Sequence, residues 1–124
     1  MDNLKYVNDK FGHDEGDFSL REIAQVLRDA FRDNDIIGRM GGDEFIVFAM
    51  TQISDYEKQI KDRIVMITRK HNDAAGKPYP IEMSTGICEF TCDAGVDIHE
   101  IIDKADEKLY KEKAEKKAKY GSYR

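Results

Sequence analysis

The feature that most constrains the fold is the run Gly41-Gly42-Asp43-Glu44, which lies between two apolar, β-prone segments, residues 35–40 and 45–50. A glycine-rich tetrad between two such runs is typical of a tight β-hairpin. We therefore expect these segments to pair as antiparallel strands, with the two acidic residues at the tip of the turn.

Amphipathic helices are predicted on both sides of this hairpin. Apolar side chains recur at helical spacing in residues 2–11 and again in residues 18–31, and the intervening residues 12–16 are expected to form a turn. A third helix is predicted from residue 54 or 55 to about residue 70, and a last one from residue 97, an aspartate that can cap it, to about residue 110. The lysine-rich tail beyond residue 110 is expected to project into solvent or fray.

The remaining segments complete the expected architecture. Residues 72–80, with a glycine and two prolines, indicate a loop, and residues 81–90 form a strand-like run. The resulting order of elements is helix, helix, strand, strand, helix, strand, helix. This order predicts an α+β fold in which helices pack on a largely antiparallel sheet.

Length and charge narrow the class of protein. The 124 residues suffice for one core but not for two, so residues 1–124 are expected to form a single domain. No segment has the roughly 20 apolar residues of a membrane span, and the start lacks the apolar run of a signal peptide. We therefore expect a cytoplasmic protein with no membrane contact from this segment, in which Cys88 and Cys92 are reduced. The net charge of -5 disfavours a nucleic-acid surface.

The acidic pair at the tip of the turn suggests a site for a divalent cation and a phosphate. Glycine lets a polyphosphate approach the backbone amides, and the carboxylates of Asp43 and Glu44 are the hard oxygen ligands that suit Mg²⁺. The alternative is that Gly41 and Gly42 supply positive φ angles and that both acidic side chains are merely solvated. For an arbitrary hairpin, this alternative is the one to favour.

The wider pattern changes that balance. The tetrad with Phe45, flanked by Arg39-Met40 and Ile46-Val47, resembles the signature of GGDEF domains of diguanylate cyclases. Further matches follow in the family's order over nearly the whole chain: Asp2-Asn3-Leu4-Lys5, Asn8-Asp9, Gly12-His13, Gly16-Asp17, Ser84-Thr85-Gly86, Ala105-Asp106, and Leu109-Tyr110 with Lys113. The resemblance implies a nucleotide-cyclase or palm-like antiparallel sheet flanked by helices. It also implies that a homodimer condenses two GTP molecules into cyclic di-GMP with Mg²⁺ or Mn²⁺, and that a full-length parent carries an upstream sensory domain.

The same resemblance assigns roles around the metal and the reacting groups. Asp43 matches a metal-binding carboxylate and Glu44 its acidic neighbour, and one of the two is the catalytic base. Met1 matches a position whose backbone carbonyl also helps to hold the metal. Lys5 matches a lysine that stabilises transition-state charge, a role that suits an ammonium group.

Other positions match nucleotide-binding residues of the family. They are Asn8 and Asp17 at the guanine edge, His13 and Gly42 elsewhere on the substrate, and Lys113 and Lys117 at the triphosphate. A carboxylate and an amide suit the donors and acceptor of guanine. Lys117 stands where the family usually has an arginine, so it keeps the positive charge but not the planar fork.

Arg32 and Asp35 fit the RxxD pattern that forms the family's inhibitory site for cyclic di-GMP, at the expected distance before the glycine turn. An arginine can stack on guanine and donate two hydrogen bonds to its edge. The alternative is an ion pair at a helix end, which contributes little energy.

The start of the chain bears on the expected activity. In the family, the first metal-binding aspartate ends an opening strand and lies two residues before the position of Asp2, which is one residue ahead of Met1. The resemblance therefore implies that these 124 residues lack the family's first strand and one metal-binding carboxylate, so that their catalysis is impaired and self-association covers the open strand edge. Two other functions stay open: a degenerate regulatory module that binds GTP or cyclic di-GMP without catalysis, and a structural or dimerisation domain.

Overall fold

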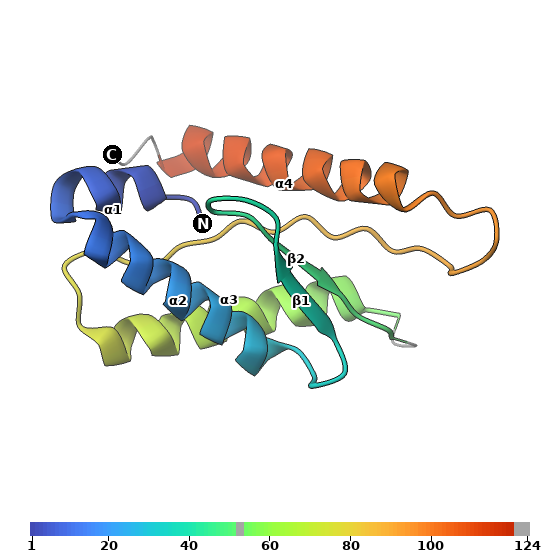
Figure 1. Ribbon diagram of the computed structural model, residues 1–124, viewed down its shortest axis with the longest axis horizontal. Helices are drawn as coiled ribbons and strands as arrows, with labels where there is room; N and C mark the ends of the chain where they lie inside the picture. Colours follow the sequence, from blue (N-terminus) through green and yellow to red (C-terminus); the bar gives the residue numbers. More distant parts are fainter. Residues whose placement is uncertain (52–53, 121–124) are drawn as a thin grey trace. The chain divides into compact units, whose positions relative to one another are not determined.

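The computed structural model describes residues 1–51 and 54–120. Its elements in chain order are α1 (Leu4–Phe11), α2 (His13–Ala30), β1 (Ile36–Arg39), β2 (Phe45–Phe48), α3 (Tyr56–Ala75) and α4 (Ile98–Tyr120) (Figure 1). Helices combined with an antiparallel sheet confirm the predicted α+β class. The chain divides into two compact units, residues 1–83 and 84–124, which are described separately. Among the helices of the described residues, none has the length and apolar character needed to cross a membrane.

A single residue joins α1 to α2. Gly12 has a φ of 99°, a backbone conformation that favours glycine. Its N–H donates to the carbonyl of Asn8 at 3.0 Å, and its carbonyl accepts from the N–H of Gly16 at 3.2 Å. The turn predicted for residues 12–16 is therefore wrong beyond Gly12. Residues 13–16 already form the first turn of α2, because one positive φ angle suffices to redirect the chain.

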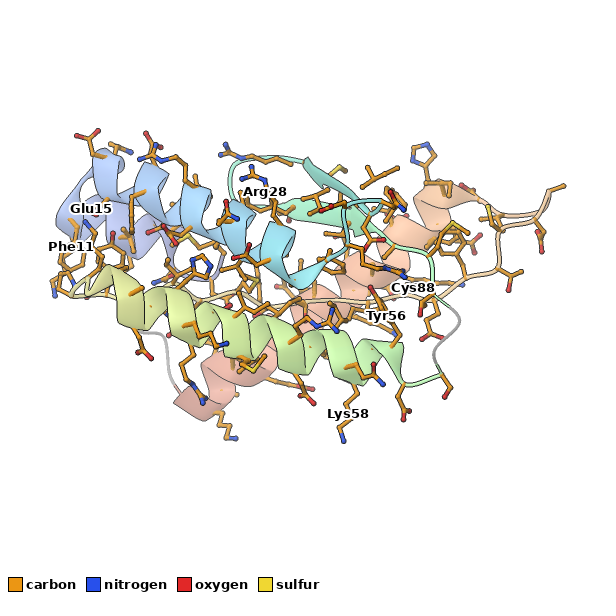
Figure 2. The ribbon with its side chains drawn as sticks, turned by 90° about the horizontal axis from the view of Figure 1, so that it is seen from below. Phe11, Glu15, Arg28, Tyr56, Lys58 and Cys88 are labelled. Carbon is orange, nitrogen blue, oxygen red and sulfur yellow. The ribbon has the colours of Figure 1, made fainter. Side chains whose placement is uncertain are left out.

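The core of the first unit lies between α1, α2 and the segment that follows α3. Its buried members are Met1, Val7, Leu20, Ile23, Leu27, Tyr79 and Ile81. The helix α3 packs along α2 (Figures 1 and 2), and Ile60 and Ile64 of α3 are buried. The apolar faces predicted for these helices thus stabilise the unit by leaving water.

The predicted hairpin is confirmed. The strands β1 and β2 pair antiparallel, with Ile36 opposite Phe48 and Arg39 opposite Phe45. The N–H of Met40 donates to the carbonyl of Glu44 at 2.9 Å and closes the turn. Each strand has four residues, so both are shorter than the β-prone runs in the sequence.

The third helix is longer than predicted. It continues to Ala75, past the expected end near residue 70, and stops at Gly76, whose φ of 60° is left-handed. The N–H of Gly76 donates to the carbonyl of Asn72 at 3.2 Å, as in a glycine C-cap. The predicted loop of residues 72–80 is therefore correct only from residue 76.

The strand predicted for residues 81–90 does not form, and this segment is drawn as coil in Figure 1. The side-chain amide of Asn72 donates to the carbonyl of Ile81 at 3.0 Å and accepts from its N–H at 2.7 Å. The carbonyl of Glu82 accepts from the N–H of Asp2 at 2.9 Å. A strand needs a continuous row of backbone partners, whereas several backbone groups of this segment pair with side chains instead: Ile81 with Asn72, Thr85 with Glu112 and Ile87 with Lys108.

In the second unit, α4 packs on the segment that precedes it. Asp97 caps the helix as predicted, since its Oδ1 accepts from the N–H of His99 at 3.0 Å. Glu112 of α4 accepts a hydrogen bond from the N–H of Thr85, and Nζ of Lys108 donates to the carbonyl of Ile87 at 2.7 Å. These contacts join both ends of the 85–87 run to the helix.

The fraying predicted beyond residue 110 is wrong for the described part of that tail. The helix α4 runs on to Tyr120, because its lysines, glutamates and alanines are good helix formers and several opposite charges stand four residues apart. The last four residues of the predicted tail, 121–124, lie outside the described residues.

Candidate functional site

The glycine turn between β1 and β2 is open on its outer side. Gly41 and Gly42 are exposed, and a Cβ atom added at either would meet no heavy atom within 4 Å. Positive φ angles occur, among the described glycines, only at Gly12 and Gly76. The alternative that Gly41 and Gly42 are needed for positive φ angles is therefore wrong. What they provide here is an unobstructed backbone.

Arg39 holds this turn from within. Its Nε donates to the carbonyl of Gly41 at 3.1 Å, and its Nη2 donates to the carbonyl of Gly42. The guanidinium thus engages two carbonyl oxygens that could otherwise face an anion, and it places a positive charge beside the turn. The sequence drew attention to Arg39 as part of a motif but gave it no role, since its partners are carbonyls that no sequence pattern identifies.

The structure brings Met1 and Asp43 together. The terminal ammonium of Met1 donates to the backbone carbonyl of Asp43 at 2.8 Å, and Met1 is buried. The side chain of Asp43 is half-buried, and Glu44 is exposed. No group of three or more His, Cys, Asp or Glu side chains gathers as a metal site within residues 1–51 and 54–120.

These groups still fit Mg²⁺. This ion is commonly held by one or two carboxylates together with substrate phosphates and water, and it does not require a cage of protein ligands. The carboxylates of Asp43 and Glu44 and the carbonyl of Met1 are hard oxygen donors of the required kind. The donor chemistry of these groups is therefore suitable for Mg²⁺.

The predicted guanine-binding residues lie at the junction of α1 and α2. Asn8 is half-buried on α1, whereas Asp17 is exposed on α2. The side chain of Asn8 lies directly against Gly16, the residue before Asp17, because a Cβ atom at Gly16 would be 1.7 Å from Oδ1 of Asn8. The structure thus places Asn8 against the residue that precedes Asp17. His13, the first residue of α2, and Lys5 of α1 are both exposed.

A buried tyrosine ties the start of α2 to the segment after α3. The hydroxyl of Tyr79 donates to Oε2 of Glu15 at 2.6 Å, and Nζ of Lys77 donates to Oε1 of the same carboxylate at 3.1 Å. Figure 2 shows Glu15 and Phe11 at the same end of α2, and the ring of Phe11 packs on that of Tyr79 with centroids 4.9 Å apart. This network keeps the α1–α2 junction in place.

The network shifts two pKa values in opposite directions. The hydrogen bond from Tyr79, and then that from Lys77, lowers the pKa of Glu15 below its usual 4.5. Burial, followed by the adjacent carboxylate of Glu15, raises the pKa of Tyr79 to about 12. At neutral pH the pair is therefore a carboxylate and a neutral phenol, which is the combination that the short hydrogen bond requires.

The predicted inhibitory pair is also close in space. The backbone N–H of Arg32 donates to Oδ2 of Asp35 at 2.8 Å, and its Nε lies 3.8 Å from the same oxygen. The guanidinium of Arg32 also donates to the carbonyl of Met50. The side chain of Arg32 is 63% exposed, whereas that of Asp35 is only 4% exposed. The arginine therefore stays accessible to a ligand while the aspartate fixes its backbone.

A pocket of about 100 Å³ opens beside this pair. It is lined by Ala30, Phe31, Arg32, Asp35, Thr51, Tyr56, Gln59, Ile60 and Arg63. Arg63 of α3 donates from Nη1 to the carbonyl of Ala30 at 3.0 Å, so a second guanidinium is fixed at the pocket. Burial raises the pKa of Tyr56. Sequence reasoning missed Arg63, because its place in the pocket follows from the packing of α3 on α2.

The predicted triphosphate-binding lysines lie on α4 in the second unit. Lys113 is half-buried and Lys117 is exposed. They stand four residues apart, so they share one face of the helix. Their contact with a triphosphate stays a prediction.

The sequence model of the family described as diguanylate cyclase, GGDEF domain, matches residues 1–119. The chain is 33% identical over 114 residues to the diguanylate cyclase DgcS of Shewanella oneidensis, which covers 92% of this chain and 37% of that protein. It is 34% identical over 116 residues to the cyclic di-GMP phosphodiesterase NbdA of Pseudomonas aeruginosa, which covers 92% of this chain and 14% of that protein.

A solved structure shows the same fold. The crystal structure of the diguanylate cyclase SiaD of Pseudomonas aeruginosa, in complex with its activator SiaC, matches with a TM-score of 0.69 and 27% identity. The match covers 90% of this chain and 43% of that chain. The chain thus spans less than half the length of each of these three proteins.

Proposed function

We propose, from the premise that the chain belongs to the GGDEF family of diguanylate cyclase domains, that it binds GTP and condenses two GTP molecules into cyclic di-GMP. Because the chain spans less than half of its relatives, it would act as the catalytic part of a longer protein whose other segments receive a signal. The proposed setting is the cytoplasm, where GTP is available.

The observation that carries this proposal is the open glycine turn beside Asp43. A Cβ atom added at Gly41 or Gly42 would meet no heavy atom within 4 Å, and Arg39 engages the carbonyls of both residues. A phosphate can therefore approach the turn without meeting a Cβ atom or a bare carbonyl oxygen. The carboxylate of Asp43 stands at the same turn, where a metal-bound phosphate would need it.

Asn8 and Asp17 supply recognition of the base. Guanine presents donors at N1–H and N2–H₂ and an acceptor at O6, which a carboxylate and a carboxamide can match. An adenine edge presents a different pattern, so the same pair discriminates against ATP. The placement of Asn8 against Gly16, next to Asp17, supports a shared role.

The reaction itself requires two nucleotides. The 3′-hydroxyl of each GTP attacks the α-phosphate of the other, and each attack breaks the bond to the β-phosphate and releases pyrophosphate. Two copies of the domain, each with its own GTP, would therefore form the productive homodimer. Either Asp43 or Glu44 would accept the hydroxyl proton, and Lys5 would offset the charge that develops on the phosphate. Lys113 and Lys117 would hold the triphosphate. Bound Mg²⁺ or Mn²⁺, held by Asp43 with Glu44 and the Met1 carbonyl, would supply charge neutralisation.

The proposal is tested by incubating the full-length protein with GTP and Mg²⁺ and separating the products by chromatography. Asp43→Asn keeps the size of the side chain and removes its charge, and we expect it to reduce cyclic di-GMP formation by about a hundredfold or more. Asp62→Asn is the matched control, because Asp62 is exposed on α3. Equal product from Asp43→Asn and from Asp62→Asn would contradict the role of Asp43.

A regulatory role is the second candidate, and the pocket beside Arg32 and Arg63 favours it. Two guanidinium groups at one pocket suit a ligand with phosphates and guanine edges, such as cyclic di-GMP. One relative, 34% identical over 116 residues, is named a cyclic di-GMP phosphodiesterase. A chain of this kind could therefore bind the nucleotide without forming it.

Equilibrium binding of cyclic di-GMP tests this second candidate. We expect Arg32→Ala and Arg63→Ala each to weaken binding by about tenfold or more, because each removes a charged donor. Lys58→Ala serves as the control, since Figure 2 shows Lys58 pointing away from α2. Binding that stays unchanged in both arginine variants would exclude this pocket. Binding without any GTP turnover in the wild-type protein would favour the regulatory role over catalysis.

The effect of residues ahead of Met1 is a separate question. It is answered by assaying a polypeptide of residues 1–124 beside one extended upstream by the strand and the aspartate that the family resemblance implies. If an upstream aspartate completes the metal site, the longer polypeptide forms cyclic di-GMP faster. Equal rates would show that the carboxylates within residues 1–124 suffice.

A further inference from the structure

Gly16 occupies a position where an alanine would ordinarily be better. It is buried within α2, and its φ is not positive, so no backbone requirement explains a glycine. Inside a helix, glycine is less favourable than alanine by about 1 kcal/mol. The residue must therefore be accounted for by what surrounds it.

The surroundings leave no room for a methyl group. A Cβ atom at Gly16 would lie 1.7 Å from Oδ1 and 2.8 Å from Cγ of Asn8, and 3.3 Å from Cδ1 of Leu4. Ordinary contact begins at 3.4 Å, so the carboxamide oxygen would have to retreat by about 1.7 Å. Leu4 lies one turn before Asn8 on α1 and packs against the core, which limits retreat in that direction.

The backbone around this contact is fixed as well. The carbonyl of Asn8 accepts from the N–H of Gly12, and the carbonyl of Gly12 accepts from the N–H of Gly16. The two helices are thereby held so that the bare Cα of Gly16 forms the surface on which the Asn8 carboxamide rests. Asp17 follows Gly16 directly, so the carboxamide rests against the residue next to the carboxylate-bearing one.

We propose that Gly16 is a positioning residue, whose missing side chain lets the Asn8 carboxamide lie beside Asp17 in the orientation that recognises a guanine base. This inference rests on the proposed function, because it assigns the base specificity of that same site. A methyl group at residue 16 displaces the carboxamide and leaves the carboxylate in place. Binding of GTP then weakens, and its preference over ATP shrinks.

A double-mutant cycle in the full-length protein tests this. Binding of a non-hydrolysable GTP analogue and of the matching ATP analogue, each with Mg²⁺, is measured by calorimetry for wild type, Gly16→Ala, Asn8→Ala and the double variant. We expect Gly16→Ala to weaken GTP-analogue binding by about tenfold, with little change for the ATP analogue. In the Asn8→Ala background, where the carboxamide is gone, Gly16→Ala should change binding by less than about twofold.

Thermal unfolding without nucleotide gives an independent readout of the same pair. Gly16→Ala should lower the Tm of the wild type but raise or leave unchanged that of Asn8→Ala, because alanine is the better helix former once it has room. Gly95→Ala is the control, since a Cβ atom there meets only Asp93 Oδ1, at 3.5 Å. If Gly16→Ala does not fold but the double variant does, the clash with Asn8 is confirmed.

The outcomes separate the two proposals. One outcome is that the wild type binds the GTP analogue and that Gly16→Ala weakens this binding equally in the wild type and in Asn8→Ala. This result overturns the positioning role of Gly16 and leaves the proposed guanine binding intact. A second outcome is that the effects of Gly16→Ala and Asn8→Ala on the Tm depend on each other but no variant binds nucleotide. This result confirms the contact between Gly16 and Asn8, and it overturns both the proposed function and the role of Gly16 in base recognition. Gly16→Ala that binds and melts like the wild type overturns the inference directly.

Discussion

Replacing Gly86 with alanine would place a methyl group inside the backbone of α4. A Cβ atom at residue 86 would lie 2.0 Å from the carbonyl oxygen of Ala105, 2.5 Å from the N of Leu109 and 3.0 Å from its Cα. Unlike the carboxamide at Gly16, these are main-chain atoms of a helix and cannot rotate away. To restore contact at 3.4 Å, the helix and the 85–87 run must separate by about 1.4 Å.

Such a separation has a predictable free-energy effect. Overpacking typically costs about 1–3 kcal/mol, and stretching the hydrogen bonds that Thr85 and Ile87 share with α4 adds about 1 kcal/mol. The smaller unfolded-state entropy of alanine offsets up to about 1 kcal/mol of this. We therefore expect Gly86→Ala to reduce the free energy of unfolding by about 1–4 kcal/mol.

Urea denaturation, combined with hydrogen exchange of the α4 amides, measures this loss and locates it. Gly95→Ala makes the same chemical change in the same unit, where the added Cβ meets only Asp93 Oδ1 at 3.5 Å. It should stay within about 0.5 kcal/mol of the wild type. If Gly86→Ala were as stable as Gly95→Ala, with unchanged exchange in α4, the close approach of residue 86 to the helix would be refuted.

Three further predictions concern the first unit. The ring nitrogens of His71 lie 2.6 and 3.0 Å from two carboxylates of α2, which raise the pKa of His71 above 6.5. The stabilising effect of His71 should therefore be complete below about pH 6.5 and lost as the pH rises through the raised pKa. The free energy of unfolding of His71→Gln, measured across pH 5–9, should lack this dependence. The pKa of Glu15 is lowered, so its contribution should be present above pH 4.5 and lost on further acidification, and Tyr79→Phe should melt with a weaker dependence on pH in that acidic window. Asn72→Ala leaves both backbone groups of Ile81 without their side-chain partner and should lower the free energy of unfolding by about 2–3 kcal/mol in urea titrations, whereas a loss below about 0.5 kcal/mol would show that water replaces the amide.

Much of the fold could be predicted from local sequence patterns, and the errors of that prediction have identifiable physical causes. The hairpin was predictable because four residues that include two glycines, placed between two β-prone runs, favour a tight turn over most other conformations. The start of α2 and the C-terminal end of α3 were misplaced because single glycines, Gly12 and Gly76, mark these two boundaries. Hydrophobic spacing does not show which glycine takes a positive φ angle. The strand expected at residues 81–90 failed for a different reason. Strand formation depends on a partner, and Asn72, a helical side chain, satisfies Ile81 instead.

The candidate site shows the same division. Family resemblance selected Asn8, Asp17, Asp43 and Arg32 by position, and their residue types match the chemistry they are proposed to perform. What surrounds them could not be read from the sequence. Arg63 reaches its pocket only because α3 packs on α2, and Arg39 finds its partners only once the turn has formed.

Because Gly12 alone joins α1 to α2, the number of residues in this part of the chain matters as much as their types for the relative placement of Asn8 and Asp17. An α-helix turns by about 100° per residue, so one residue inserted between Asn8 and Asp17 would carry Asp17 about a quarter of the way round the axis of α2. The side chains would be intact, yet they would no longer face one ligand. Substitutions here alter one contact at a time, whereas a one-residue insertion or deletion would dismantle the pair at once. The number of residues between Asn8 and Asp17 is therefore fixed by the α1–α2 corner. Mutant libraries of this domain should vary the residue types in this segment and keep its length.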